Sequence, residues 1–193
     1  EWVLKNRKLD GGGFAHGESD RGGPFLGDTL SMGHAALDLY AATGERKWLA
    51  VASGAGDFIT AKFQDSAGGF ATSAQSEATS GVFAKPAKIP EEQIQTARFA
   101  NILNRYTGAK KYRDLAEHAA RYALSASHLE RPSVHPGALL IDAELAREPT
   151  HITIVGQKDD PRSATLHATA LAFPASYRRI DWWDKREGAM TNP

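Results

Sequence analysis

The sequence predicts a mostly helical protein with a small strand–helix–strand module near its C-terminus. The first observation behind this fold class is an internal repeat: residues 27–59 align without a gap on the segment that starts at residue 91, 64 positions later. Each copy reads as a helix, a Thr-Gly pair and a second helix, which predicts a repeated αα-hairpin. The second observation is the β-branched run THITIVG at 150–156, which predicts a buried strand.

Composition excludes several classes of protein. The chain has 193 residues, enough for one large domain or for a domain with a small annex. Lys plus Arg equals Asp plus Glu at 23 each, and this balance argues against a dedicated nucleic-acid or anionic-membrane surface. Because the chain has no cysteine, disulfides, thiolate metal sites and cysteine nucleophiles are excluded. The absence of a signal peptide and of an apolar run of about 20 residues favours a cytoplasmic protein without membrane spans.

Helical periodicity and helix stops define the two hairpins. In the first copy, Leu30, Leu37 and Tyr40 recur at helical spacing and form one apolar stripe. Gly44 and Gly108 follow the first helix of each copy, where a glycine in the left-handed conformation would end it. Repeated hairpins of this length predict either a solenoid or a toroid of hairpins.

Two glycine-rich stretches lie beside the first predicted hairpin. LDGGGF at 9–14 precedes it, and AGGF at 67–70 follows it. We expect the glycines to permit tight backbone turns and each following Phe to anchor its turn in the core. Such loops form either the rim of a toroid cavity or a pair of ordinary surface turns.

The pattern changes after the helical-hairpin region, which we place at residues 1–148. Residues 149–184 are predicted to form the strand–helix–strand module, with Asp159 or Asp160 as the N-cap of its helix. A strand–helix–strand connection of this length needs parallel strands. The tail at 185–193 is predicted to be a frayed end.

Several separate motifs in these segments resemble one protein family. In the family's order, the chain contains FAHGESDRGGPFLGDTLSMGHAALDLYAATGERKWLAVA, FQDSAGGFAT, HPGALL and PTHITIVGQKDDP, and the likeness covers roughly residues 10–185. The chain resembles the C-terminal half of the thioredoxin-domain-containing family that includes YyaL and spermatogenesis-associated protein 20. This resemblance implies part of an (α/α)6 toroid of the six-hairpin glycosidase type, similar to N-acylglucosamine 2-epimerases, with a small strand–helix–strand insertion.

The resemblance also implies expectations about function. The family's thioredoxin-like domain and its cysteines have no counterpart in this sequence, so no redox function is carried over. Because the six-hairpin fold usually holds sugars, we expect a carbohydrate ligand, bound or processed without a cofactor by carboxylate and histidine acid–base chemistry. Two hairpins do not close a six-hairpin ring, so we expect a homodimer or contact with missing domains of a longer chain. The alternative is a non-catalytic interaction or regulatory module.

The first candidate site is the loop that holds His16 and Glu18, together with Asp28. In an extended segment His16 and Glu18 face the same side, and carboxylates around a cleft can supply acid and base for glycoside cleavage. We therefore predict His16, Glu18 and Asp28 as catalytic residues. Asp28 also has a structural explanation, which we favour, as the N-cap of the first hairpin helix. Glu91 and Glu92 occupy the equivalent repeat position, which supports that explanation.

His34, Asp65 and Phe70 are the predicted substrate-binding residues. His34 lies two turns into the first helix, and we favour its alternative role as a hydrogen-bonded packing residue. The alternative role of Asp65 is to close its own loop. The alternative role of Phe70 is to anchor the second Gly-Gly-Phe turn in the core. No spacing typical of a metal site, a phosphate loop or a hydrolase elbow occurs, so neither a metal nor a cofactor is predicted.

Overall fold

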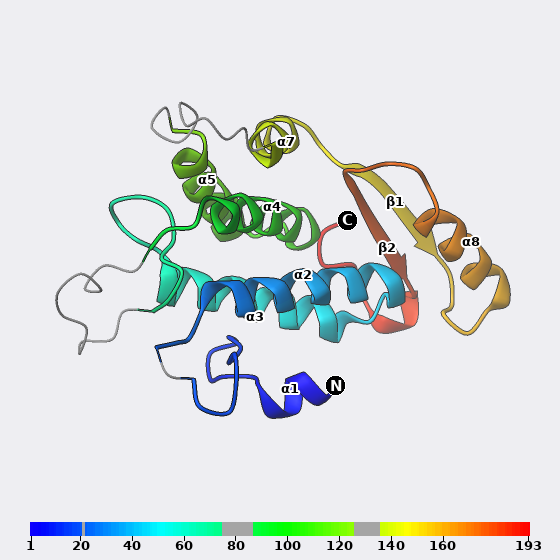
Figure 1. The fold of residues 1–193 in the computed structure, drawn as a ribbon. Helices are drawn as coiled ribbons and strands as arrows, with labels where there is room; N and C mark the ends of the chain where they lie inside the picture. The colour runs from blue at the N-terminus through cyan, green and yellow to red at the C-terminus, as the bar shows by residue number, and fades with distance from the viewer. Residues whose placement is uncertain (21, 75–86, 126–135) are drawn as a thin grey trace.

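Two helical hairpins form the body of the molecule (Figure 1). The computed structural model describes residues 1–20, 22–74, 87–125 and 136–193. The helices are α1 (Trp2–Asn6), α2 (Leu26–Thr43), α3 (Arg46–Phe63), α4 (Pro90–Thr107), α5 (Lys110–Ala123) and α7 (Pro136–Leu145). α2 and α3 form the first hairpin and α4 and α5 the second, and α2 and α4 begin 64 residues apart. The predicted hairpin repeat is confirmed.

The first helix of each hairpin ends at the predicted Thr-Gly pair. Gly44 and Gly108 adopt the left-handed conformation, with φ of 67° and 68°. Their N–H groups donate to the carbonyl oxygens of Tyr40 and Asn104, each at 2.7 Å. A side chain in this conformation would crowd the neighbouring carbonyl, which explains why glycine occupies both positions.

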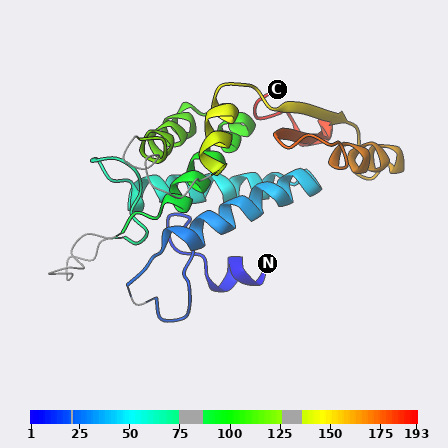
Figure 2. The same cartoon turned by 45° about the horizontal axis from the view of Figure 1, so that its top comes forward.

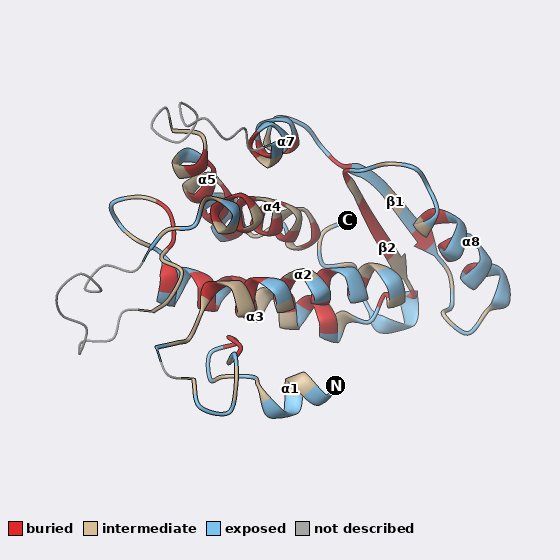
Figure 3. Ribbon diagram, viewed as in Figure 1, coloured by how far each residue is buried: buried red, intermediate tan, exposed pale blue. Residues whose placement is uncertain are grey.

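The core lies between the helices of the two hairpins (Figure 3). Small side chains occupy much of it; among the fully buried ones are Ala52, Ala55, Ala100, Ala116 and Ala119. Small side chains let the helices approach closely, and larger ones such as Phe99 and Leu103 fill the remaining space. Contacts of this kind explain how the alanine-rich helices pack against one another in the two hairpins.

The two Gly-Gly-Phe loops dock onto the hairpins in the same way. Phe14 and Phe70 are both buried. The Phe14 N–H donates to Thr29 Oγ1 at 3.1 Å. The Phe70 N–H donates to Gln93 Oε1 at 2.7 Å. Thr29 and Gln93 lie 64 residues apart, at the same position of the repeat. Each Phe therefore anchors its loop to the first helix of the hairpin that follows, as predicted.

Backbone pairing extends this equivalence to the segments that lead into the loops. Lys8 pairs with Phe14 in an isolated antiparallel bridge, and Gln64 pairs with Phe70 in the same manner. Both bridges join the residues just after a helix, α1 or α3, to the Phe of the loop that follows it. The structural repeat thus includes the loops as well as the hairpins.

The predicted strand–helix–strand module is present near the C-terminus. Its elements are β1 (Thr150–Val155), α8 (Pro161–Leu171) and β2 (Arg178–Trp183), followed by a 3-10 turn at Lys185–Glu187. The strands are parallel, with Thr150 opposite Arg178. The Asp160 side chain caps α8 by accepting from the Arg162 N–H at 2.9 Å. The predicted parallel crossover and one of the two proposed caps are confirmed.

The module lies at the C-terminal ends of α2 and α4, on the same side of the hairpins in both views (Figures 1 and 2). The buried Asp181 of β2 accepts a hydrogen bond from the Tyr40 hydroxyl at 2.8 Å and from Arg179 Nε at 2.6 Å. The Tyr106 hydroxyl oxygen accepts from the Ile180 N–H at 3.2 Å. Because Tyr40 belongs to α2 and Tyr106 to α4, β2 is joined to both hairpins.

The C-terminal tail differs from the sequence prediction. Arg46 Nη2 donates to the carbonyl oxygens of Gly188 and Ala189, at 3.1 and 2.8 Å. Asn192 Nδ2 donates to the carbonyl oxygen of Arg105 at 2.8 Å. These bonds tie the tail to α3 and α4, so the predicted frayed end is wrong. The local sequence lacks this information because the partners are distant in the chain.

Within the described residues the structure shows two hairpins and a two-stranded sheet, and these elements do not close a ring. The toroid expected from the family resemblance therefore stays a prediction. In the described part of the chain, no helix combines the length and the apolar character needed to cross a membrane.

Candidate functional site

Two acidic residues lie near each other where the first helix of each hairpin begins. Asp28 lies in the first turn of α2, and Glu92 lies in the first turn of α4, 64 residues later. Glu92 Oε1 lies against Gly27, 3.3 Å from the position that a β-carbon would take there. A side chain at Gly27 would press on Glu92. The missing side chain thus lets the Glu92 carboxyl group approach the start of α2, where the charge of Asp28 acts on it.

Each of these carboxyl groups is contacted by the Gly-Gly-Phe loop that precedes its hairpin. His16 Nδ1 lies 3.1 Å from Asp28 Oδ1 and 3.2 Å from Asp28 Oδ2. Thr72 Oγ1 donates to Glu92 Oε1 at 3.0 Å. His16 and Thr72 both lie two residues after the Phe of their loop. The repeat therefore makes the same contact twice, with an imidazole in the first copy and a hydroxyl in the second.

The two carboxyl groups have unlike surroundings. Burial raises the pKa of Glu92; the Thr72 hydroxyl opposes this shift, and the charge of Asp28 adds to it. Glu92 Oε2 is buried and has no hydrogen-bond partner among the described residues. The Asp28 side chain is 27% exposed and that of His16 is 73% exposed, so solvent reaches this pair. The site thus combines a carboxyl group that retains its proton to higher pH with an accessible carboxyl group beside an imidazole.

Asp28 does not cap α2. The N-cap position is taken by Phe25, and no side chain bonds a helix N–H there. The N–H of Leu26 instead donates to the carbonyl oxygen of Thr72 at 2.9 Å. The backbone of the second loop thus satisfies the first N–H of the helix, and the N-cap role favoured for Asp28 is wrong. Its carboxyl group is left available to His16.

Glu18 does not join the pair. Its side chain is 91% exposed, and its nearest charged partner is Arg7, with Glu18 Oε1 3.9 Å from Arg7 Nη2. His16 faces Asp28 instead and meets the Phe25 ring edge-on at 6.1 Å between centroids. Of the three residues predicted to be catalytic, the structure brings together His16 and Asp28.

His34 is held by packing and by a hydrogen bond. Its Nε2 lies 3.3 Å from the carbonyl oxygen of Gln95, and its ring tilts against Phe99 at 5.3 Å between centroids. Burial lowers the pKa of His34 against the opposing effects of the Gln95 carbonyl and the Asp38 carboxylate. The packing role is confirmed, and His34 lies further along α2 than Asp28.

Asp65 and Phe70 organise the second Gly-Gly-Phe loop. Asp65 Oδ1 accepts from the Ala67 N–H at 2.9 Å, and Asp65 Oδ2 lies 2.7 Å from Lys88 Nζ. The bond to Lys88 is the main reason that the pKa of Asp65 is lowered. The ring of Phe70 is buried and meets the His118 ring edge-on. Asp65 closes its own turn as expected, and neither residue lies in the carboxylate pair.

Glu92 and Thr72 were not selected by sequence reasoning. A signal was present, since the 64-residue repeat places Glu92 where the first copy has Asp28. An acidic residue that recurs at a helix start is usually explained by its interaction with the helix dipole. That explanation does not suggest that the two acidic residues form one site. Equivalent positions of neighbouring repeats lie next to each other in space, which is the rule that would have paired them.

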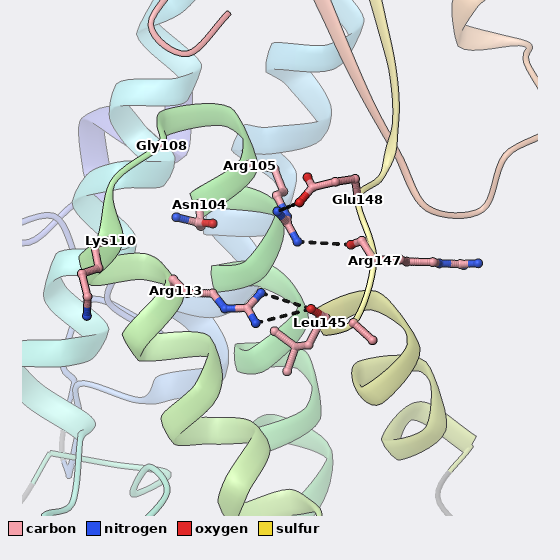
Figure 4. Close-up of a pocket in the computed structure, with 9 residues that line it drawn as sticks. Asn104, Arg105, Gly108, Lys110, Arg113, Leu145, Arg147 and Glu148 are labelled. Carbon is pink, nitrogen blue, oxygen red and sulfur yellow. Dashed lines mark hydrogen bonds and ion pairs between the residues drawn. The ribbon is translucent and has the colours of Figure 1, made fainter.

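A cavity of about 570 Å³ lies at the C-terminal end of α4, away from Asp28 and Glu92 (Figure 4). Its arginines bond the end of α7: Arg105 Nη2 donates to the carbonyl oxygen of Arg147 at 3.1 Å, and Arg113 donates to that of Leu145 at 3.3 Å. Arg105 also pairs with Glu148. Cations that satisfy the last carbonyls of a helix have a structural role. Here they hold the connection between α7 and β1.

No group of three or more His, Cys, Asp or Glu side chains in the described segments is arranged to hold a metal ion. No protein-family model matches this chain, and a search of curated proteins finds no similar sequence.

Proposed function

We propose that this chain binds a carbohydrate and acts on it by acid–base chemistry at Asp28 and Glu92. The observation that carries the proposal is the unlike surroundings of two carboxyl groups close enough for the charge of one to affect the pKa of the other. Such a difference is how acid and base roles are divided between carboxyl groups in enzymes, including those that cleave glycosides. The exposure of Asp28 and His16 supports access for a ligand.

In the proposed reaction, Glu92 is the acid and Asp28 is the base. Glu92, whose pKa is raised by burial, donates its proton to the oxygen of the leaving sugar. Asp28 accepts a proton from the water that attacks the anomeric carbon as the glycosidic C–O bond breaks, so the leaving sugar gains the hydrogen and the other sugar gains the hydroxyl group. The proton on Asp28 then returns to Glu92 through solvent. His16 positions the Asp28 carboxyl group through its Nδ1. Sugar epimerisation by the same acid and base is the second chemistry that we include in the test.

We further propose that the hairpins belong to an (α/α)6 toroid in a cytoplasmic protein. Two features support this fold: the hairpin repeat, and the placement of α2 and α4 side by side with both N-termini at the same end (Figure 1). The sequence resemblance to the family of six-hairpin glycosidase-like proteins points in the same direction. The ring is proposed to be completed by a second copy or by further domains.

The test is an assay of nitrophenyl glycosides and oligosaccharides over an acid-to-neutral pH series, with product sugars identified by chromatography. We expect turnover that Glu92→Gln and Asp28→Asn each reduce at least about 100-fold, the usual scale for loss of a general acid or base. Glu91→Gln, an exposed neighbour in the same helical turn, is the matched control and is expected to retain activity. Turnover by Glu92→Gln equal to that of the wild type would contradict the proposal.

The alternative is a non-catalytic interaction module, and one observation favours it. An apolar groove of about 340 Å³ lies between β1 and α8. Leu166 and Phe173, which line it, are 61% and 46% exposed. Exposed apolar grooves of this kind are typical of interaction surfaces. Absence of turnover with every glycoside, in a folded protein, would favour this alternative.

A further inference from the structure

A separate cavity of about 400 Å³ lies between the hairpins and the strand–helix–strand module. α2 contributes His34 and Asp38, α4 contributes Ile102, and the end of α8 and the start of β2 contribute Leu171 and Arg178. Asp38 lies ten residues beyond Asp28 on the same helix, which corresponds to about 15 Å along the axis. This cavity is therefore distinct from the carboxylate pair.

Two opposite charges line the cavity without neutralising each other. Among the described residues, Asp38 forms no ion pair with a cation and Arg178 forms none with a carboxylate. One guanidinium N–H of Arg178 donates to the carbonyl oxygen of Phe173, and the group has four further donors. Asp38 is exposed and Arg178 is half-buried, so a ligand in the cavity can reach both charges from solvent.

His34 adds a neutral polar group to the same cavity. Because its Nε2 bonds a backbone carbonyl oxygen, the proton is on Nε2, and Nδ1 is an acceptor. The lowered pKa of His34, caused mainly by burial, agrees with a neutral ring at neutral pH. An acceptor at Nδ1 suits an N–H or O–H donor, so His34 and Asp38 favour the same kind of ligand group.

The remaining wall is mostly apolar, with Tyr106 and Ser176 as its polar members. Leu37, Ile102, Leu171 and Ile180 line it, and the cavity volume falls within the range of small-molecule sites. A ligand that matches this surface needs a positive group for Asp38, a carboxylate for Arg178 and an apolar part. Arginine binds carboxylates through two parallel N–H bonds, so the Arg178 end of the cavity prefers a carboxylate group.

We propose that this cavity binds a free α-amino acid with an apolar side chain. Its ammonium group faces Asp38 and His34 Nδ1, its carboxylate faces Arg178, and its side chain lies against Ile102 and Leu171. The proposal goes beyond the carbohydrate function and does not depend on Asp28 or Glu92.

The test is isothermal titration calorimetry of the whole chain with L-leucine and L-phenylalanine as probes. Leucine amide, which lacks the carboxylate, and N-acetyl-leucine, which lacks the ammonium group, are the matched ligands. We expect a free amino acid to bind and each blocked form to bind at least about tenfold more weakly, the scale of one charge-assisted contact. Equal binding of free and blocked leucine, or no heat with either probe, would overturn the proposal.

Substitutions of the charged residues that line the cavity test where leucine binds. Asp38→Asn and Arg178→Gln are each expected to weaken leucine binding at least about tenfold, and Arg178→Lys is expected to weaken it less because it keeps the charge. Asp114→Asn and Arg162→Gln remove exposed charges elsewhere and are expected to bind like the wild type. Melting curves without ligand confirm that each variant is folded. Unchanged binding in both folded Asp38→Asn and Arg178→Gln would also overturn the proposal.

The two proposals are separable by the same titration. Glu92→Gln is expected to bind leucine with wild-type affinity, since it lies at the other end of α4 from Ile102. Loss of leucine binding in folded Glu92→Gln would contradict the assignment of the amino acid to the cavity lined by His34, Asp38 and Arg178. Failure of every sugar assay, by contrast, leaves this prediction in force.

Discussion

At the residue scale, the surroundings of Glu92 determine how its charge affects stability. Its carboxyl group is half-buried, with Oε2 unpartnered and no cation paired with it among the described residues. Folding therefore disfavours the ionised form, and the folded protein binds this proton more tightly than the unfolded chain does. Stability is reduced once the pH exceeds the raised pKa.

Glu92→Gln is therefore expected to raise the melting temperature at neutral pH. The amide keeps an acceptor for Thr72 and removes the charge that folding disfavours. Below the ordinary pKa of 4.5 the wild-type carboxyl is protonated in both states, so the gain should vanish in acid and grow as pH rises through the raised pKa. Thermal melts over a pH series measure this. A Glu92→Gln protein less stable than the wild type at neutral pH would show that the explanation is wrong.

Gly12 provides a second test at this scale. Its φ is +103°, and a β-carbon there would lie 2.6 Å from the backbone oxygen of Gly54, which has no freedom to move away. Gly12→Ala is expected to cost about 2 kcal/mol in the free energy of unfolding. Gly17→Ala, in the same loop with nothing within 4 Å, is expected to cost less than about 0.5 kcal/mol. Urea denaturation measures the loss of unfolding free energy in each variant, and equal losses would contradict the proposed clash between Gly12→Ala and the Gly54 backbone.

Single residues were the hardest features to predict from the sequence. The contact between His16 and Asp28 depends on how the first loop folds back, and the start of α2 is fixed by Thr72, which lies 46 positions after Leu26. Neither relation has a local signature. The Phe of each loop was predictable, because a large apolar residue after paired glycines has few roles other than anchoring.

At the element scale, the docking of each loop depends on one side chain of the helix that receives it. Gln93 is buried; its Oε1 accepts from the Phe70 N–H at 2.7 Å, and its Nε2 donates to the Phe70 carbonyl oxygen at 2.8 Å. In the first copy Thr29 makes one such bond, to the Phe14 N–H. The second loop therefore depends more strongly on its helix.

Gln93→Ala is expected to destabilise the protein by about 3 kcal/mol, because it leaves a buried N–H and a buried carbonyl of Phe70 without partners. Gln95→Ala is the control in the same helix; its amide bonds the exposed Glu91, and we expect a change within about 0.5 kcal/mol. Denaturant unfolding measures both values. Similar costs for the two variants would show that the loop is held by other contacts.

Helices and strands were the features that the sequence predicted best. The stops at Gly44 and Gly108 are local, and the β-branched run at 150–155 has a strong preference for a strand. The tail at 185–193 was missed because its order comes from Arg46 and Arg105, which are distant in the chain.

At the scale of the whole molecule, Asp181 joins the strand module to the hairpins. It accepts from Tyr40 and Arg179, and its Oδ2 lies 2.9 Å from His151 Nε2. Asp181 and Arg179 are both buried, so each compensates the charge of the other. We infer that the module and the hairpins unfold together.

Asp181→Asn is expected to cost about 3–5 kcal/mol, because it leaves the buried guanidinium of Arg179 without its carboxylate. Tyr40→Phe removes one hydrogen bond from the same carboxylate and is expected to cost about 1 kcal/mol. Calorimetry of both variants should show one transition at a lowered temperature. A module that melts separately in the wild type, or an Asp181→Asn cost no larger than that of Tyr40→Phe, would contradict the inferred joint unfolding.

The most direct test of the central claim is a thermal-shift titration of the chain with monosaccharides, amino sugars and short oligosaccharides. A sugar at a hundred times its Kd raises the free energy of unfolding by about 2.7 kcal/mol, which melting curves resolve. We predict that at least one sugar stabilises the wild type and Glu18→Gln, whose side chain is exposed, and that Asp28→Asn abolishes the shift. A flat response of the wild type across the panel, or a shift that Asp28→Asn retains in full, would contradict it.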